Sequence, residues 1–167
     1  MIYFITGGER SGKSRYAQEL AIKLTAMPIY LATSRKWDKD FEKRVQKHKD
    51  DRDERWTNIE EEKYLSKVDL MHHVAVIDCV TLWLTNFYVD TKYNVEESFE
   101  QVKEEFEKLA RIDCTLIIIS NEIGMGVHAE TEIGRKFVEL QGWMNQHIAK
   151  RANKVVLMVS GIPVNIK

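Results

Sequence analysis

The sequence predicts an α/β fold, in which helices cover both faces of a mostly parallel sheet. Short apolar segments alternate along the chain with segments whose apolar residues recur every three or four positions, as in strands and amphipathic helices. The strongest apolar segments are hydrophobic nearly throughout, which indicates strands buried on both faces. The chain has 167 residues, of which 44% are hydrophobic and 31% charged. We therefore expect one globular domain over residues 1–167.

Six short apolar runs are expected to form strands. The first leads directly into glycines, and the third ends at Asp78. The sixth is a short run close to the fifth. The expected strands are residues 2–5, 28–33, 74–77, 115–119, 155–159 and 162–166.

Five segments between these runs are expected to form helices, because their apolar residues recur at helical spacing. The most regular repeat consists of Val95, Phe99, Val102, Phe106, Leu109 and Ile112. The second segment balances acidic and basic residues, and it still places Phe41, Val45 and His48 on one helical face. The expected helices are residues 13–24, 38–55, 81–87, 95–112 and 131–152.

Charge and composition exclude several classes of protein. Lys and Arg number 25 against 26 Asp and Glu, for a net charge of −1. No broad basic surface is therefore expected to hold nucleic acid or an anionic membrane. The apolar runs are far shorter than the roughly 20 residues of a membrane-spanning helix, and the first residues lack the pattern of a secretory signal. Cys79 and Cys114 are expected to be reduced, buried thiols, so we expect a cytoplasmic protein.

The most informative motif is Gly7-Gly8-Glu9-Arg10-Ser11-Gly12-Lys13-Ser14, which fits G-x-x-x-x-G-K-[ST] without a mismatch. It follows an expected strand and precedes an expected helix, as a phosphate-binding loop requires. Backbone N–H groups and the helix N-terminus would hold phosphate oxygens, Lys13 would reach the terminal phosphates, and Ser14 would ligate Mg²⁺. The alternative is a glycine turn with an exposed lysine. The expected fold is a three-layer P-loop NTPase (RecA-like) domain with a mostly parallel central sheet.

Two carboxylates are candidates for the magnesium side of this loop. Asp78 directly follows an expected strand, where nucleotide-binding folds place such a carboxylate. The alternative is that Asp78 caps the following helix. Glu122 is the second candidate, within Asn121-Glu122-Ile123-Gly124-Met125-Gly126, which resembles a catalytic loop at the carboxyl edge of a sheet.

The charged segment 38–55 contains a candidate nucleophile. His48 lies between Lys47 and Lys49, and neighbouring cations lower the pKa of an imidazole, which keeps it neutral and nucleophilic. Lys49 and Arg52 could also hold phosphate oxygens. The alternative is a solvated helix with ion pairs. The remaining histidines are expected to be structural: His72, His73, His128 and His147, the last packed on an apolar stripe.

Motifs spread over most of the chain resemble one family. They are residues 6–14, Tyr30-Leu31-Ala32-Thr33-Ser34, Arg44-Val45-Gln46-Lys47-His48-Lys49-Asp50 with Arg52, Trp56 and Glu60, residues 121–126, and Val159-Ser160-Gly161-Ile162-Pro163-Val164. In these the sequence resembles the bifunctional adenosylcobinamide kinase / adenosylcobinamide-phosphate guanylyltransferases of cobalamin biosynthesis. Residues 62–73 and 88–112 match only in general character.

The resemblance implies two reactions and a set of site residues. Members phosphorylate adenosylcobinamide with ATP or GTP, and then transfer GMP from GTP to the product through a guanylylated histidine, here His48. The implied cofactor is Mg²⁺, held by Ser14 and Asp78, and the implied assembly is a homotrimer. Some relatives have Glu in place of Asp78, and some have a second histidine in place of Lys47. Nucleotide contacts are implied at Thr6, Gly7, Gly8, Glu9, Arg10, Ser11, Gly12, Lys13, Ser14, Ala32, Thr33, Ser34, Lys49, Asp50, Asp51, Arg52, Glu60 and Asp78.

Two other functions share the phosphate loop. A monofunctional kinase of a small metabolite would need no histidine nucleophile. A non-enzymatic nucleotide switch is less compatible with the sequence, which lacks the Asn-Lys-x-Asp motif of switch GTPases. The general base of the kinase step and the corrinoid pocket are not readable from the sequence.

Overall fold

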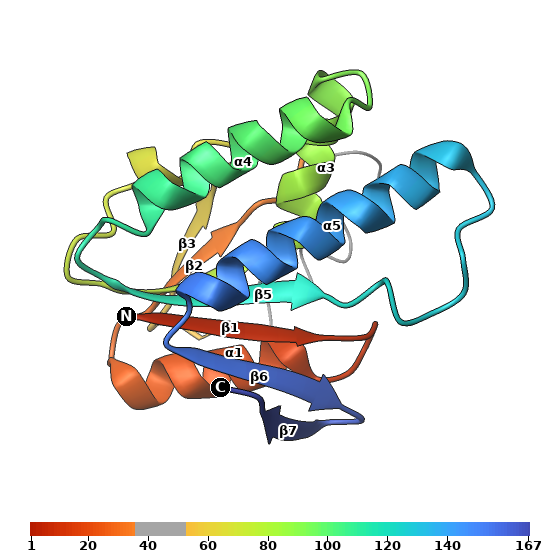
Figure 1. The fold of residues 1–167 in the computed structure, drawn as a ribbon. Coiled ribbons are helices and arrows are strands. Elements are labelled where there is room, and N and C mark those ends of the chain that lie inside the picture. Colours follow the sequence, from red (N-terminus) through yellow and green to blue (C-terminus); the bar gives the residue numbers. More distant parts are fainter. Residues whose placement is uncertain (36–52) are drawn as a thin grey trace.

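The computed structural model describes residues 1–35 and 53–167, which form a seven-stranded sheet with helices on both faces (Figure 1). The strand order is β3-β2-β4-β5-β1-β6-β7. All neighbouring strands are parallel except β6 and β7, which pair antiparallel. The strands are β1 Ile2–Gly7, β2 Ile29–Ala32, β3 Thr57–Glu60, β4 Val74–Asp78, β5 Thr115–Asn121, β6 Lys154–Val159 and β7 Ile162–Asn165.

The helices form the outer two layers. Among the described residues, α1 lies on one face of the sheet, while α3, α4 and α5 lie on the other (Figure 1). The helices are α1 Lys13–Leu24, α3 Val80–Asp90, α4 Val95–Leu109 and α5 Glu132–Arg151, with a short 3₁₀ helix, η1, at Leu65–Lys67. None of the helices in residues 1–35 and 53–167 is long and apolar enough to cross a membrane.

Two hydrophobic clusters hold the three layers together, one on each face of the sheet. Successive strand residues point to opposite faces, so Phe4 joins the cluster beneath α3, α4 and α5, and Ile5 joins the cluster beneath α1. On the α1 side, Ala17 and Ala21 are completely buried. Burying one large apolar side chain contributes roughly 1.5–3 kcal/mol. Burial on both faces is the reason for the continuous apolar runs, and it confirms the predicted three-layer α/β fold.

The order of the strands decides which loops meet. β1, which leads into the phosphate loop, lies between β5 and β6, and β4, which ends at Asp78, lies on the other side of β5. This order agrees with the predicted RecA-like class. Because the strands are parallel, the carboxyl ends of β1, β4 and β5 meet at one edge of the sheet.

The structure changes the predicted elements in four places, the first being α3, which ends at Asp90, three residues beyond the predicted end at residue 87. β3 was not expected, because it is an edge strand with three of four residues exposed and no apolar run. The α4 helix ends at Leu109, three residues before the predicted end, and turns follow it. Residues 38–52 of the predicted helix 38–55 lie outside the described part, whereas residues 53–55 form a turn in which the Trp56 N–H donates to the Asp53 carbonyl.

Candidate active site

The glycines of the phosphate loop are required by close packing. β1 ends at Gly7, and α1 begins at Lys13. A Cβ on Gly7 would lie 2.5 Å from the Met158 carbonyl oxygen, and Gly12 has a φ of 94°. Both positions therefore exclude larger residues, the first by contact and the second by backbone conformation.

Neighbouring strands hold this loop from both sides. The Glu122 N–H, just after β5, donates to the Gly7 carbonyl over 2.9 Å. The Gly161 N–H, in the tight turn between β6 and β7, donates to the Ser11 carbonyl over 3.0 Å. These hydrogen bonds fix the loop before any ligand binds, which lowers the ordering cost of binding.

Lys13 is the buried cation of the phosphate loop. Its side chain is buried, and its ammonium donates to the Gly8 carbonyl over 2.6 Å. Burial lowers the pKa of Lys13, and the nearby Glu9, Cys79 and Asp78 partly oppose this shift. A buried cation is less hydrated than one in water, so its attraction for a phosphate is stronger.

Ser11 supplies a further polar group at the loop. Its hydroxyl oxygen is buried and has no hydrogen-bond partner among the described residues. A buried hydroxyl without a partner costs free energy, which a ligand oxygen would recover. The Thr6 hydroxyl is likewise buried and has no hydrogen-bond partner among the described residues.

Ser14 and Asp78 form the candidate magnesium pair. The Ser14 hydroxyl donates to Asp78 Oδ2 over 3.0 Å, and the Tyr30 hydroxyl donates to the same oxygen. Two adjacent ligands of an octahedral Mg²⁺, each about 2.1 Å from the ion, lie about 3.0 Å apart, so this pair fits the ion. The described residues contain no cluster of three or more His, Cys, Asp or Glu side chains that could hold a metal. Phosphates and water would complete the shell, as is usual for Mg²⁺.

The alternative role of Asp78 as a helix cap is wrong. The residue that caps α3 is Cys79, and no side chain makes a capping hydrogen bond there. Glu122, the second carboxylate candidate, accepts a hydrogen bond from the Gly124 N–H over 2.9 Å. Its side chain shapes the turn after β5.

Thr33, which was predicted to contact the nucleotide together with Ala32 and Ser34, occupies a different environment from these two residues. It is completely buried, and its hydroxyl donates to the Cys79 carbonyl and accepts from the Cys79 N–H, over 2.8 and 2.9 Å. Asn86 Nδ2 donates to the Thr33 carbonyl. Thr33 therefore joins the end of β2 to the start of α3, whereas Ala32 and Ser34 are partly exposed beside it.

Glu60 lies at the edge of the sheet formed by the carboxyl ends of the parallel strands, but at the far end of that edge from β1. It ends the outermost strand, β3, where it pairs with Ala32 of β2. Four strand spacings separate β3 from β1, which is about 19 Å. The structure therefore brings Glu60 beside Ala32, and separates it from the phosphate loop. The predicted residues His48, Lys49, Asp50, Asp51 and Arg52 lie outside the described residues.

A buried polar network supports the carboxyl end of β5. Ser120 Oγ donates to Asn145 Oδ1 over 2.6 Å, and Gln141 Nε2 donates to Ser120 Oγ over 2.8 Å. Next to it, Asn121 Nδ2 donates to Thr81 Oγ1 over 3.1 Å. The network ties β5 to α5 and α3, and so fixes the strand between Gly7 and Asp78. No role in the site was predicted for Ser120, Gln141, Asn145 or Tyr30, because polar residues within helices and strands carry no local sign of such pairing.

The cysteines and one histidine have the environments that the sequence predicts. Cys79 and Cys114 are free and buried, and burial raises the pKa of Cys79 to about 12. His147 packs against Phe99 and Phe106 and shares a hydrogen bond with Glu107. These groups are structural.

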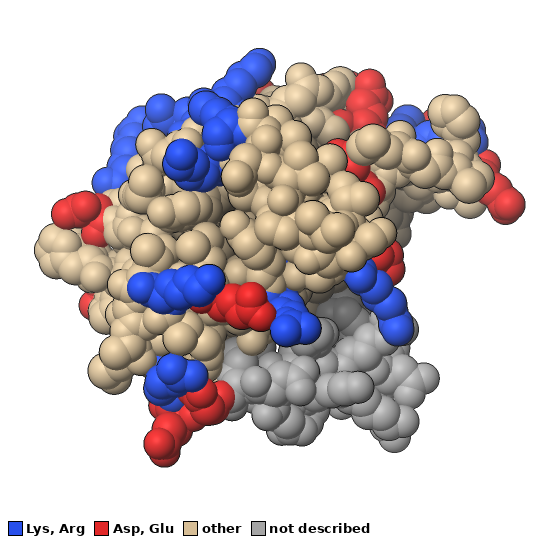
Figure 2. Space-filling view, turned by 90° about the horizontal axis from the view of Figure 1, so that it is seen from below, with Lys and Arg blue, Asp and Glu red and all other residues tan. Residues whose placement is uncertain are grey.

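The charged side chains form no broad basic surface on the face shown in Figure 2. Lys and Arg are interspersed with Asp and Glu around a largely uncharged centre. On this face, no broad basic surface is therefore available to bind anions.

The fold and the site together define a P-loop nucleotide-binding protein of the three-layer α/β class. Residues 3–166 match the family "Cobinamide kinase / cobinamide phosphate guanyltransferase". The chain belongs to this family, and it is therefore a bifunctional kinase and guanylyltransferase of cobalamin biosynthesis.

Three relatives of known name match this chain over nearly their whole length, at similar sequence identity. The chain is 33% identical to the bifunctional adenosylcobalamin biosynthesis protein CobU of Escherichia coli K12, with both chains covered completely. It is 34% identical to CobP of Pseudomonas aeruginosa, over 98% of this chain and 95% of that one. It is also 34% identical to CobU of Salmonella typhimurium, with complete coverage of both. Among solved structures it is similar to the flagellar accessory protein FlaH from Methanocaldococcus jannaschii, with 15% identity, a TM-score of 0.45, and coverage of 98% and 75%.

Proposed function

We propose that the chain phosphorylates the aminopropanol hydroxyl of adenosylcobinamide with ATP or GTP, and then transfers GMP from GTP to the new phosphate through a guanylylated His48. The observation that carries the proposal is the pre-formed phosphate loop, with Lys13 and the Ser14–Asp78 pair at one edge of the sheet. Family membership supports the two reactions.

In the kinase step, the corrinoid hydroxyl oxygen attacks the γ-phosphorus. The bond from the γ-phosphorus to the β,γ-bridging oxygen breaks, the nucleoside diphosphate leaves, and the hydroxyl proton is released to water. Lys13 and the backbone N–H groups of the loop hold the phosphate oxygens and stabilise their charge. Ser14 and Asp78 would hold Mg²⁺, which supplies further charge neutralisation when bound. This step depends on positioning more than on a covalent intermediate.

In the guanylyl transfer, the neutral His48 imidazole attacks the α-phosphorus of GTP. A P–N bond forms, the bond from the α-phosphorus to the α,β-bridging oxygen breaks, and pyrophosphate leaves. A phosphate oxygen of the phosphorylated corrinoid then attacks the same phosphorus and breaks the P–N bond, which regenerates His48 and yields adenosylcobinamide-GDP. Covalent catalysis divides one difficult transfer into two easier ones.

One nucleotide site serves both reactions in this proposal. The described residues contain one phosphate loop, and residues 1–35 and 53–167 build a single sheet around it. We further propose a homotrimer in the cytoplasm. A neighbouring subunit would supply walls of the active site that a chain of 167 residues cannot.

The test of the proposed function is the covalent intermediate. The purified protein is incubated with GTP labelled at the α-phosphorus, denatured, and analysed for label on the protein. We expect a GMP adduct that is labile in acid and stable in base, as a phosphoramidate is. The His48→Ala variant should form no adduct, and the variant His73→Ala, which removes an exposed histidine, should form it as the wild type does.

The contrary results have distinct meanings. Retention of the adduct by His48→Ala would exclude His48 as the nucleophile. Absence of an adduct in the wild type, with corrinoid phosphorylation intact, would favour a monofunctional kinase. Slow nucleotide hydrolysis without any corrinoid-dependent turnover would favour a nucleotide switch.

A further inference from the structure

We propose that the loop between β5 and α5 forms a subsite for the corrinoid substrate, in which a cavity at His128 holds one carboxamide arm and Met125 and Val127 contact the edge of the macrocycle. The proposal rests on the proposed function and names the part of the site that binds the phosphoryl acceptor.

The first observation is the cavity itself. It measures about 130 Å³ and is lined by residues of the loop and of the first turns of α5. Pockets for whole small molecules measure roughly 300–1,000 Å³, so this cavity is too small for a macrocycle and suits one side arm. The lining residues are Ile123, Gly124, Gly126, Val127, His128, Ala129, Arg135 and Val138.

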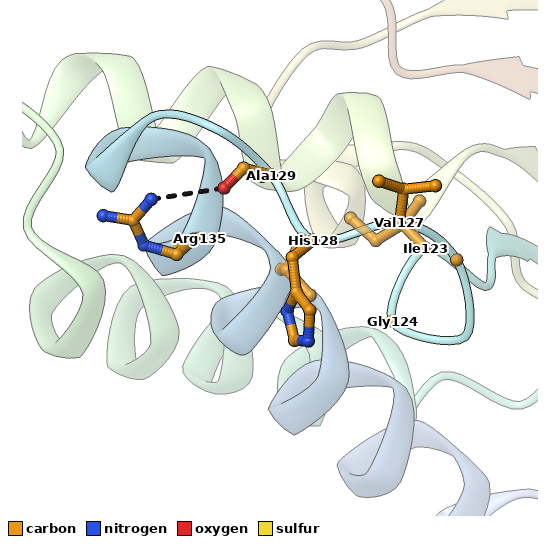
Figure 3. Close-up of a pocket in the computed structure, with 8 residues that line it drawn as sticks. Ile123, Gly124, Val127, His128, Ala129 and Arg135 are labelled. Carbon is orange, nitrogen blue, oxygen red and sulfur yellow. Dashed lines mark hydrogen bonds between the residues drawn. The ribbon is translucent and has the colours of Figure 1, made fainter.

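The second observation is the polarity of the cavity. In Figure 3 the His128 ring lies between Arg135 on one side and Val127 and Ile123 on the other. Neither ring nitrogen of His128 bonds to another group of the described residues. Apolar walls with one imidazole and one guanidinium suit a neutral amide, whose carbonyl accepts hydrogen bonds and whose methylenes pack on aliphatic carbon.

The third observation is the exposure of the loop. Val127 is 96% exposed and Met125 is 78% exposed, the two highest values among the large hydrophobic residues of the described chain. Val127 also lines the cavity, and Met125 lies two residues before it on the same loop. The rim of a corrin ring carries methyl groups as well as carboxamide arms, so the cavity and these two exposed side chains match two parts of one ligand.

The fourth observation is that both ends of the loop are fixed. At the start, the Glu122 carboxylate accepts from the Gly124 N–H. At the end, Arg135 Nη1 donates to the carbonyls of Ala129 and Glu130 over 3.2 and 2.7 Å, the former drawn in Figure 3. The Thr131 hydroxyl caps α5 by accepting from the Gly134 N–H. A loop held in this way loses little entropy on binding.

The fifth observation is the position of the loop. It begins at Glu122, whose N–H donates to the Gly7 carbonyl at the start of the phosphate loop. The corrinoid must present first a hydroxyl and then a phosphate to the nucleotide at this edge. Because the loop begins one hydrogen bond from the phosphate loop, a corrinoid bound along it would direct its reacting arm toward the nucleotide while another arm occupies the cavity.

The experiment compares corrinoid and nucleotide kinetics in three variants of the full chain. Val127→Ser and His128→Ala remove one apolar and one polar contact, and Met27→Ser is the matched control. Met27 is also exposed, at 70%, but it lies before β2 at the opposite edge of the sheet. We expect the KM for adenosylcobinamide in the kinase reaction to rise roughly tenfold in Val127→Ser and in His128→Ala. The KM for GTP should stay within about twofold in both, and Met27→Ser should match the wild type.

Several outcomes would overturn the subsite. They include an unchanged KM for adenosylcobinamide in both variants, and an equal rise in the KM for GTP. A changed oligomeric state of Val127→Ser in size-exclusion chromatography, with unchanged corrinoid affinity, would instead assign the loop to an interface between copies. Failure of the wild type to turn over adenosylcobinamide would contradict the proposed function, so the two failures are distinguishable.

Discussion

The Ser14 hydroxyl, in the first turn of α1, donates a hydrogen bond to the Asp78 carboxylate at the end of β4, with 3.0 Å between the two oxygens. The residues are 64 positions apart in the sequence, and β5 lies between β4 and β1, the strand that leads into the phosphate loop. Their meeting joins the phosphate loop to a carboxylate that no local motif contains.

The Asp78→Asn variant tests the role of the carboxylate. Asn keeps an oxygen that can accept from Ser14 and Tyr30, and it removes the negative charge that would hold Mg²⁺. We expect turnover to fall roughly 100-fold, and the Mg²⁺ concentration required to rise, because a charged ligand is lost. Rates measured over a Mg²⁺ titration check this. The control is Asp69→Asn, an exposed carboxylate before β4. An unchanged Mg²⁺ dependence in Asp78→Asn would remove Asp78 from the metal site.

The Gly7→Ala variant tests the packing of the phosphate loop. The new Cβ would meet the Met158 carbonyl oxygen at 2.5 Å and Ser11 Oγ at 2.8 Å, so the backbone must shift. We expect a loss of about 2–4 kcal/mol in the free energy of unfolding. By contrast, Gly142 lies within α5 with open space around its Cβ position. Gly142→Ala should therefore stabilise the protein by about 0.5–1 kcal/mol. Urea unfolding measures both, and equal effects would contradict the structure.

The Thr33→Val variant separates a structural role from nucleotide binding. Val keeps the shape of Thr33 but removes both hydrogen bonds to Cys79, which leaves a buried N–H and a buried carbonyl without those partners. We expect a loss of about 1–3 kcal/mol in the free energy of unfolding. Thr85→Val is the control, because the Thr85 hydroxyl only donates to a carbonyl one helical turn earlier. If Thr33→Val raised the KM for GTP without any loss of stability, Thr33 would belong to the nucleotide site.

Asp90 makes the stability of the protein depend on pH in the acidic range. Hydrogen bonds from Arg35 and Lys63 lower the pKa of Asp90 from 3.8 to about 2. Since the pKa is lower in the folded state, the ion pairs stabilise the protein above pH 3.8, and this contribution is lost as the pH falls toward 2. Asp90 is partly exposed, so the contribution is about 1 kcal/mol or less. Asp90→Asn should be less stable than the wild type at pH 7, and the difference should disappear near pH 2. A difference that stayed constant with pH would contradict this assignment.

The sequence predicts those parts of the fold that depend on local pattern. The phosphate loop is contiguous, and its glycines and lysine are recognisable because backbone contact with phosphate limits the residues that fit. The strands beneath both helix layers are recognisable because burial on two faces requires continuous apolar runs. β3 has neither property, since three of its four residues are exposed at the edge of the sheet.

Long-range polar contacts are the part that the sequence does not predict. Asp78 was expected at the site from its place after a strand, but the second donor to its carboxylate, Tyr30, comes from a neighbouring strand. The network of Ser120, Gln141 and Asn145 likewise depends on how α5 crosses the sheet. His128 was expected to be structural, and its place in a cavity emerges only when the loop after β5 is folded against α5. Each of these depends on three-dimensional register that no short segment specifies.

In the proposed function, one phosphate loop serves both the kinase and the guanylyl transfer. The most direct test measures both rates in Lys13→Ala, beside Lys23→Ala, which removes an exposed lysine near the end of the same helix. We expect Lys13→Ala to lose both activities by roughly 100-fold or more, with corrinoid phosphorylation and GMP-adduct formation falling together, while Lys23→Ala keeps both. Loss of one activity with the other intact in Lys13→Ala would contradict a shared site.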